Sequence, residues 1–152
     1  MPVVLRKVSS ASLNEYPQWQ HDLYKIYADA PEQRRQLDAS QVPLDAPTFV
    51  DQSLQAGAYF AAALFNDHLI AALRVQEQED VWQISHLCVR RVTRRRGVAS
   101  RLLALVAAEA AQVNKSLTSP LYALEMPDHI LLQKMGYQLD AASESYLWHV
   151  RH

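Results

Sequence analysis

The chain has 152 residues, of which 49% are hydrophobic, and its 15 basic and 16 acidic side chains leave a net charge of −1. This composition predicts a folded domain and argues against intrinsic disorder. The nearly neutral charge gives no support to general binding of nucleic acid or anionic membranes. A single cysteine, Cys88, excludes an intramolecular disulfide, and with scattered histidines it offers no metal-ligand spacing, so no metal site is expected.

Neither a signal peptide nor a membrane span is predicted. Residues Met1–Arg6 lack the long apolar stretch of a signal peptide. The longest apolar run, around Ala58–Phe65, is far too short to cross a bilayer. We therefore expect one cytoplasmic domain over residues 1–152.

The first third of the chain predicts a strand followed by helices. Val3–Lys7 suits an opening strand, and Leu13–Ala28 has apolar residues at helical spacing. Asp29–Asp45, with two prolines and much charge, is expected to be a loop with room for one helical turn. Pro47 is placed to begin a further helix, and Gly57 to end it.

The middle of the chain predicts an antiparallel meander of three strands. Ala58–Phe65 and His68–Gln76 are separated by Asn66-Asp67, and such residues tolerate the positive φ of a tight hairpin. The acidic turn Glu77–Asp80 then leads to the third strand, Val81–Arg91.

The period changes to helical over Gly97–Val113, which carries one apolar stripe. After it we expect a strand, a short helix ended by Gly136 and two closing strands, at Ser119–Leu124, Pro127–Met135, Tyr137–Leu139 and Ser145–Val150. A meander followed by a β-α-β crossover predicts an α/β (α+β) fold. Its sheet is mixed and mostly antiparallel, with helices on both faces.

The junction between the meander and the long helix is rich in arginine. Within twelve residues without an acid lie Arg90, Arg91, Arg94, Arg95, Arg96 and Arg101. Gly97 opens the helix, whose first backbone N–H groups have no internal acceptor and, with the helix dipole, favour phosphate oxygens. Ala99 keeps the turn small, Ser100 adds a hydroxyl donor, and guanidinium groups pair well with phosphates. The junction therefore predicts a phosphate-bearing ligand.

Two other interpretations of the arginine cluster stay open. One is a solvated basic turn without a ligand. The other is a site for RNA or DNA, although no basic face or aromatic platform surrounds the arginines. A kinase-type or dinucleotide-type phosphate loop needs a glycine spacing that this chain lacks.

The same junction resembles the acetyl-CoA motif of the GCN5-related N-acetyltransferase (GNAT) superfamily. That motif reads Gln/Arg-x-x-Gly-x-Gly/Ala, and here it is Arg94-Arg95-Arg96-Gly97-Val98-Ala99 after the strand Ile84–Val89. Lys134-Met135-Gly136-Tyr137 stands in the place of the late Leu-Gly-Phe signature. The resemblance covers most of the chain and implies a GNAT fold whose strands splay at an acetyl-CoA site.

By this resemblance the cofactor is acetyl-CoA or CoA. Its pantetheine arm would lie like an extra strand beside Leu87–Val89, where the fourth and fifth strands part. The amides of Arg95–Ser100 would receive the pyrophosphate, and Arg94, Arg95 or Arg101 would reach the 3′-phosphate. The implied cofactor-binding residues are Leu87, Cys88, Val89, Arg94, Arg95, Arg96, Gly97, Val98, Ala99 and Ser100.

Several stretches resemble the PanZ (PanM) family of bacterial acetyl-CoA sensors within this superfamily. They are Phe65-Asn66, Leu69, Ala71-Ala72, Arg74-Val75, Leu87, Val89-Arg90 and Val92–Val98, with Asp22-Leu23 and Lys25-Ile26 upstream. This resemblance implies that the chain binds the zymogen of aspartate 1-decarboxylase and promotes its self-cleavage. Pantothenate synthesis would thereby be coupled to the level of acetyl-CoA.

The sequence meets the requirements of an N-acetyltransferase poorly. Leu132 stands at the position of the tyrosine that in many family members protonates the departing thiolate, and leucine cannot donate a proton. Gln83 and Ser85, on the strand that would supply a base, are poor bases. An N-acetyltransferase acting on a small-molecule or protein amine and a sensor without catalysis both remain open.

His86 and Tyr122 are the candidate catalytic residues that remain. The unperturbed pKa of histidine suits a base near neutral pH. Strand alternation, however, groups His86 with Ile84 and Cys88, and only a bulge would reverse this. Tyr122, on the predicted splayed strand, would be able to donate a proton to sulfur.

Overall fold

The computed structural model describes residues 2–38, 42–94, 96–122 and 124–150. Within them the chain forms a seven-stranded sheet in the order β1-β2-β3-β4-β5-β7-β6. The strands are β1 (Val4–Val8), β2 (Tyr59–Phe65), β3 (His68–Glu77), β4 (Val81–Val89), β5 (Ser116–Pro120), β6 (Gln138–Asp140) and β7 (Ser145–Trp148). The helices are α1 (Ser10–Glu15), α2 (Pro17–Ala28), α3 (Ala46–Gln55), α4 (Val98–Gln112) and α5 (Met126–Lys134), with short 3-10 turns η1 (Glu32–Arg35) and η2 (Arg91–Thr93).

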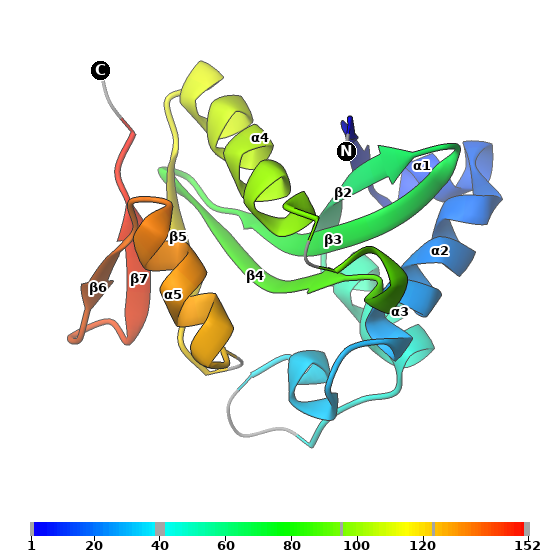
Figure 1. The fold of residues 1–152 in the computed structure, drawn as a ribbon, viewed down its shortest axis with the longest axis horizontal. Coiled ribbons are helices and arrows are strands. Elements are labelled where there is room, and N and C mark those ends of the chain that lie inside the picture. Colours follow the sequence, from blue (N-terminus) through cyan, green and yellow to red (C-terminus); the bar gives the residue numbers. More distant parts are fainter. Residues whose placement is uncertain (1, 39–41, 95, 123, 151–152) are drawn as a thin grey trace.

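An apolar core lies on each face of the sheet, and helices cover both faces (Figure 1). On one face Leu102 and Val106 of α4 pack with Ile84 of β4. On the other face Ile26 of α2 and Phe49 of α3 are fully buried. Among the described strands β4 and β5 pair in parallel and the other neighbouring pairs are antiparallel. The predicted α/β fold with a mixed, mostly antiparallel sheet is confirmed.

The predicted hairpin after β2 is confirmed in detail. Asn66 and Asp67 have φ of 49° and 66° and connect Phe65 directly to His68, which pairs with it. Two residues of positive φ give a turn whose twist matches that of the flanking strands.

Two predicted elements have different bounds in the structure. The helix expected over Leu13–Ala28 is two helices, because the chain turns at Tyr16 and Pro17 begins the second. Proline is favoured in a first helical turn, whereas within a helix it removes a hydrogen bond. The strand expected over Ser119–Leu124 is β5, which begins at Ser116 and ends at Pro120.

The strands β4 and β5 separate beyond their first three residue pairs. Their parallel pairing runs from Val81 opposite Ser116 to Gln83 opposite Thr118, whereas β4 continues to Val89. On its other side β4 pairs with β3 by placing Ser85 opposite Arg74 and Cys88 opposite Ala72. The two residues between, His86 and Leu87, therefore oppose the single residue Leu73. This arrangement is a β-bulge in β4, and a bulge bends its strand.

We predict that truncation of the α4 core contact destabilises the whole fold. Leu102→Ala removes a fully buried side chain, and such changes cost about 2–5 kcal/mol of unfolding free energy. Val113→Ala is the control, since this side chain at the end of α4 is 54% exposed and should cost no more than about 0.5 kcal/mol. Urea unfolding followed by circular dichroism measures both, and equal losses would contradict the prediction.

Candidate functional site

A cavity of about 410 Å³ lies between the end of β4 and the start of α4. Its volume falls in the range of about 300–1,000 Å³ that is usual for sites of small ligands. Most of the predicted cofactor-binding residues line it, namely Leu87, Cys88, Val89, Arg94, Gly97, Val98, Ala99 and Ser100. Arg96 is exposed and does not line it, and Arg95 lies outside the described residues.

The first turn of α4 presents free backbone donors to this cavity. Gly97 precedes the helix with φ of +74°, in the left-handed region that glycine adopts without strain. A Cβ at this position would meet no atom within 4 Å, so the backbone conformation, and not the available space, favours glycine here. The amide of Arg101 bonds to the Gly97 carbonyl (3.1 Å), which leaves the amides before it without intrahelical acceptors.

The outer half of β4 offers a free strand edge to the same cavity. The Arg90 amide donates to the Ile70 carbonyl (2.8 Å), so the backbone groups of Arg90 point toward β3. Because orientation alternates along an antiparallel pair, those of Leu87 and Val89 point the other way, into the gap that β5 leaves. Arg34 donates to the Leu87 carbonyl, and Arg94 Nε donates to the Val89 carbonyl (3.2 Å).

Part of the arginine cluster is bonded within the protein. Arg90 Nε and the Arg91 amide donate to the carboxylate of Asp29 at 2.8 and 3.0 Å, and Arg94 donates to the Asp29 carbonyl at 2.8 Å. Burial alone raises the pKa of Asp29, but the hydrogen bonds and charges of Arg91 and Arg90 outweigh it and lower this pKa. These contacts tie the end of α2 to the end of β4.

The bulge in β4 places His86 differently from simple alternation. Ile84 packs in the core under α4, whereas Cys88 packs in the core under α2 and α3. Alternation grouped both residues with His86, and that grouping is wrong for Ile84, which lies on the opposite face, but holds for Cys88. His86, with φ of 57°, is 2% exposed, and its ring contacts Phe49 of α3 at 4.9 Å between centroids.

Both ring nitrogens of His86 are engaged. Nε2 bonds to the Gln36 carbonyl, and since a carbonyl only accepts, Nε2 carries the hydrogen. Nδ1 therefore accepts from the Ser85 hydroxyl at 2.6 Å. Burial, assisted by the positive charges of Arg74 and Arg34, lowers the pKa of His86 to about 4. His86 is thus a neutral, weakly basic side chain near pH 7.

Tyr122 is bonded to the loop between α2 and α3, the loop that also contains Gln36. It follows β5 instead of lying within it, and its hydroxyl donates to the Leu37 carbonyl at 2.8 Å. Burial raises the pKa of Tyr122 above its ordinary value. The two candidate proton-transfer side chains are therefore both bonded to consecutive backbone carbonyls, those of Gln36 and Leu37.

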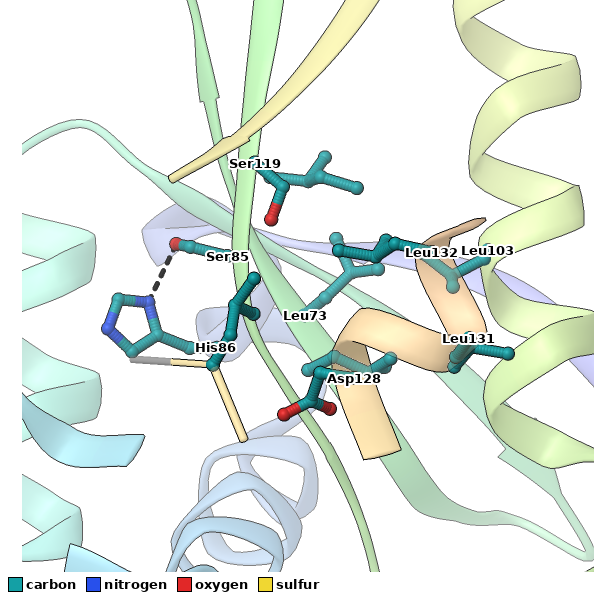
Figure 2. Close-up of a pocket in the computed structure, with 11 residues that line it drawn as sticks. Leu73, Ser85, His86, Leu103, Ser119, Asp128, Leu131 and Leu132 are labelled. Carbon is teal, nitrogen blue, oxygen red and sulfur yellow. Dashed lines mark hydrogen bonds between the residues drawn. The ribbon is translucent and has the colours of Figure 1, made fainter. Parts of the chain in front are cut away.

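A smaller cavity of about 20 Å³ lies at the inner end of the gap and adjoins the first, since Leu87, Asp128 and Leu131 line both. Six leucines and Ile84 form most of its lining, and Leu132, which is 4% exposed, is one of them (Figure 2). Its polar lining residues are Ser85, His86, Ser119 and Asp128. Figure 2 also shows the His86 ring turned away from these leucines toward Ser85.

Cys88 is a buried residue of β4. Its thiol is directed to the Ile26 carbonyl (3.3 Å), and burial raises its pKa. A raised pKa disfavours the thiolate, which is the nucleophilic form.

Arg34 and Asp128 also line the site but were not predicted from the sequence. Arg34, only 8% exposed, forms an ion pair with Asp128 of α5 across the cavity. The two residues are far apart in the chain, and Arg34 stands in a charged loop where a solvated side chain is the ordinary expectation. A local pattern could not have revealed this pair.

The chain matches the family described as "Acetyltransferase (GNAT) domain, PanZ" over residues 7–136. This match spans most of the chain. It includes β4, the start of α4 and the loop residue Gln36, whose carbonyl bonds to His86. The chain belongs to the PanZ family of GNAT domains.

Solved structures share the fold of this PanZ-family domain at low sequence identity. The Escherichia coli protein YhhK bound to coenzyme A is 23% identical, with a TM-score of 0.64 and coverage of 98% of this chain and 99% of that one. A GNAT-family protein of Desulfovibrio desulfuricans is 14% identical (TM-score 0.69, 97% of each chain). Aminoglycoside 6'-N-acetyltransferase complexed with coenzyme A is also 14% identical (TM-score 0.61, 95% of this chain and 94% of that one).

A search among curated proteins gives no significant match. No helix among the described residues is long and apolar enough to cross a membrane.

We predict that His86 makes the stability of this PanZ-family domain depend on pH. Its pKa in the folded chain, about 4, is below the ordinary value of about 6.5, so the unfolded chain binds the extra proton first. The contribution is complete above pH 6.5 and is lost as the pH falls toward 4, by up to about 1.4 kcal/mol per pH unit.

The measurement is urea unfolding of the wild type and of His86→Gln at several pH values from 4 to 7. Glutamine does not titrate, so the unfolding free energy of the variant should fall less steeply with decreasing pH. If the unfolding free energies of the wild type and the variant fall equally with decreasing pH, the pKa of His86 is not lowered as expected.

Proposed function

We propose that this chain is an acetyl-CoA sensor that binds the zymogen of aspartate 1-decarboxylase and promotes its maturation in CoA biosynthesis. The observation that carries the proposal is the capping of His86 and Tyr122 by the Gln36 and Leu37 carbonyls. A ligand bound in the gap would find neither a free base nor a free acid beside it. Membership of the PanZ family and the open cavity at the start of α4 support the binding half of the proposal.

The cavity suits the chemistry of acetyl-CoA from one end to the other. At its outer end the free amides of Val98, Ala99 and Ser100 favour the pyrophosphate, and the exposed Arg96 and Arg101 add positive charge. At its middle the free edge of β4 favours an arm that carries amide groups, as pantetheine does. The identity of the arginine that meets the 3′-phosphate stays a prediction, as does a cytoplasmic location.

The small inner cavity favours the acetyl form of the ligand. About 20 Å³ has room for one group of roughly water size, which is also close to the size of a methyl group. Most of its lining is apolar, six leucines and Ile84, and apolar side chains are a better surrounding for a methyl group than for water. Free CoA would leave this space unfilled, so we propose that acetyl-CoA binds more tightly than CoA.

A second candidate function is N-acetyl transfer to a small-molecule or protein amine. The His86 and Tyr122 rings lie 5.8 Å apart at the inner end of the gap, on the side of the sheet that the loop covers. If the loop opened, both side chains would face an acceptor. Release of free CoA in the presence of amines, abolished in both His86→Gln and Tyr122→Phe, would favour this function over sensing.

We predict that the purified protein binds acetyl-CoA and that Ser100→Glu weakens this binding at least about tenfold, a loss that about 1.4 kcal/mol of repulsion between the new carboxylate and the pyrophosphate produces. Ser10→Glu is the matched control, since it also adds a glutamate to a first helical turn, at an exposed position of α1. Isothermal titration calorimetry with acetyl-CoA and with CoA measures the affinities. Absence of binding to the wild type would remove the proposed function.

We predict that the wild type accelerates self-cleavage of the decarboxylase zymogen only when acetyl-CoA is present. Gel electrophoresis of the zymogen over time, with and without acetyl-CoA, measures the rate. Ser100→Glu should fail in this assay and Ser10→Glu should succeed. Equal cleavage with and without acetyl-CoA would contradict the coupling.

A further inference from the structure

Arg34 spans the gap that forms the large cavity. It lies in η1, on the loop that joins α2 to α3, and its guanidinium donates to the Leu87 carbonyl of β4. The same guanidinium forms an ion pair with Asp128 of α5 on the other side of the gap. Its Nε is buried and has no hydrogen-bond partner among the described residues, so this position does not satisfy the side chain fully.

The Leu87 carbonyl belongs to the free edge of β4. Leu87 and Val89 are the residues whose backbone groups point away from β3, and both line the cavity together with Arg34. An extended arm that pairs with this edge through amide groups needs the space beside Leu87. The arm and the Arg34 guanidinium therefore compete for one place.

The two residues whose carbonyls bond to His86 and Tyr122 follow Arg34 closely in the loop and act on the opposite side of the sheet. The Gln36 carbonyl accepts from His86, and the Leu37 carbonyl accepts from Tyr122. Three attachments of the loop to the gap thus fall within four residues, Arg34 to Leu37. The backbone that connects Arg34 to these two carbonyls is only two to three residues long, so a shift of the loop backbone at Arg34 moves them as well.

We infer that acetyl-CoA displaces Arg34 from the Leu87 carbonyl and thereby loosens the loop segment 32–38, which this contact holds to β4. This inference rests on the proposed function and specifies how the site is regulated. Ligand binding in the cavity then changes the conformation of this loop on the α3 side of the sheet. A partner protein that contacts the loop would therefore distinguish the protein with ligand from the protein without it.

Arg35 provides a control within the same loop. Its Nε donates to the Leu44 carbonyl at 2.6 Å, and its Nη1 donates to the carbonyls of Tyr27 and Ala30 at 3.0 and 3.1 Å. All three acceptors lie near the two ends of the loop, and none lies on the free edge of β4. Loss of Arg35 loosens the loop without freeing Leu87.

The test compares acetyl-CoA binding by the wild type, Arg34→Met and Arg35→Met in isothermal titration calorimetry. Removal of a competing internal group raises the fraction of binding-competent molecules, so Arg34→Met should bind about tenfold more tightly than the wild type. Arg35→Met should stay within about threefold of the wild type. Unchanged or weaker binding by Arg34→Met overturns the inference, and so does an equal gain in both variants. A wild type that does not bind acetyl-CoA instead overturns the proposed function.

Hydrogen exchange of the wild type tests the same inference without a substitution. Amides of residues 32–38 should exchange faster when acetyl-CoA is bound, because the loop loses its attachment to Leu87. Exchange that is unchanged or slower in this segment on saturation with acetyl-CoA overturns the inference.

Discussion

Between Ser85 and Cys88, β4 carries one residue more than β3 opposite it, and the rest of the site depends on this bulge. A bulge bends its strand and interrupts pairing, and the pairing of β4 with β5 ends at Gln83, three residues before His86, where the bulge begins. The gap that follows gives the cavity its volume and leaves the edge of β4 free. The same extra residue turns His86 toward α3, away from the side where Ile84 packs under α4.

The two sides of the sheet thus differ in chemistry. The side toward α4 gathers donors without intrahelical acceptors and exposed arginines, a surrounding that stabilises a polyanionic ligand. The side toward α3 holds the groups that would move protons, but burial lowers the basicity of His86, and main-chain carbonyls occupy both it and Tyr122. Donors suited to an anion therefore lie on one side, and on the other side both proton-transfer groups are bonded to main-chain carbonyls. This division is the basis of the proposed sensor function.

The loop between α2 and α3 connects these two sides. Through Arg34 it reaches the cavity, and through Gln36 and Leu37 it covers the proton-transfer groups. A buried ion pair such as Arg34 with Asp128 loses much of its Coulombic gain to desolvation, so stability alone does not explain its position across a ligand-sized cavity. The inferred competition between Arg34 and a ligand for the Leu87 carbonyl gives a reason for this position.

The sequence by itself determined the elements that local chemistry controls. Turn propensity predicted the Asn66-Asp67 hairpin, and helix-end chemistry predicted the start of α4 after Gly97. Motif spacing identified the arginine cluster and showed that Leu132 stands where many family members have a tyrosine. All of these signals act over a few residues. Tertiary structure alone decided the rest. The bulge that reverses His86 arises from the register of β4 against β3, and the contacts of Arg34, His86 and Tyr122 join residues about 50 to 94 positions apart. Such pairings depend on how the whole chain packs, and short-range patterns carry no record of them.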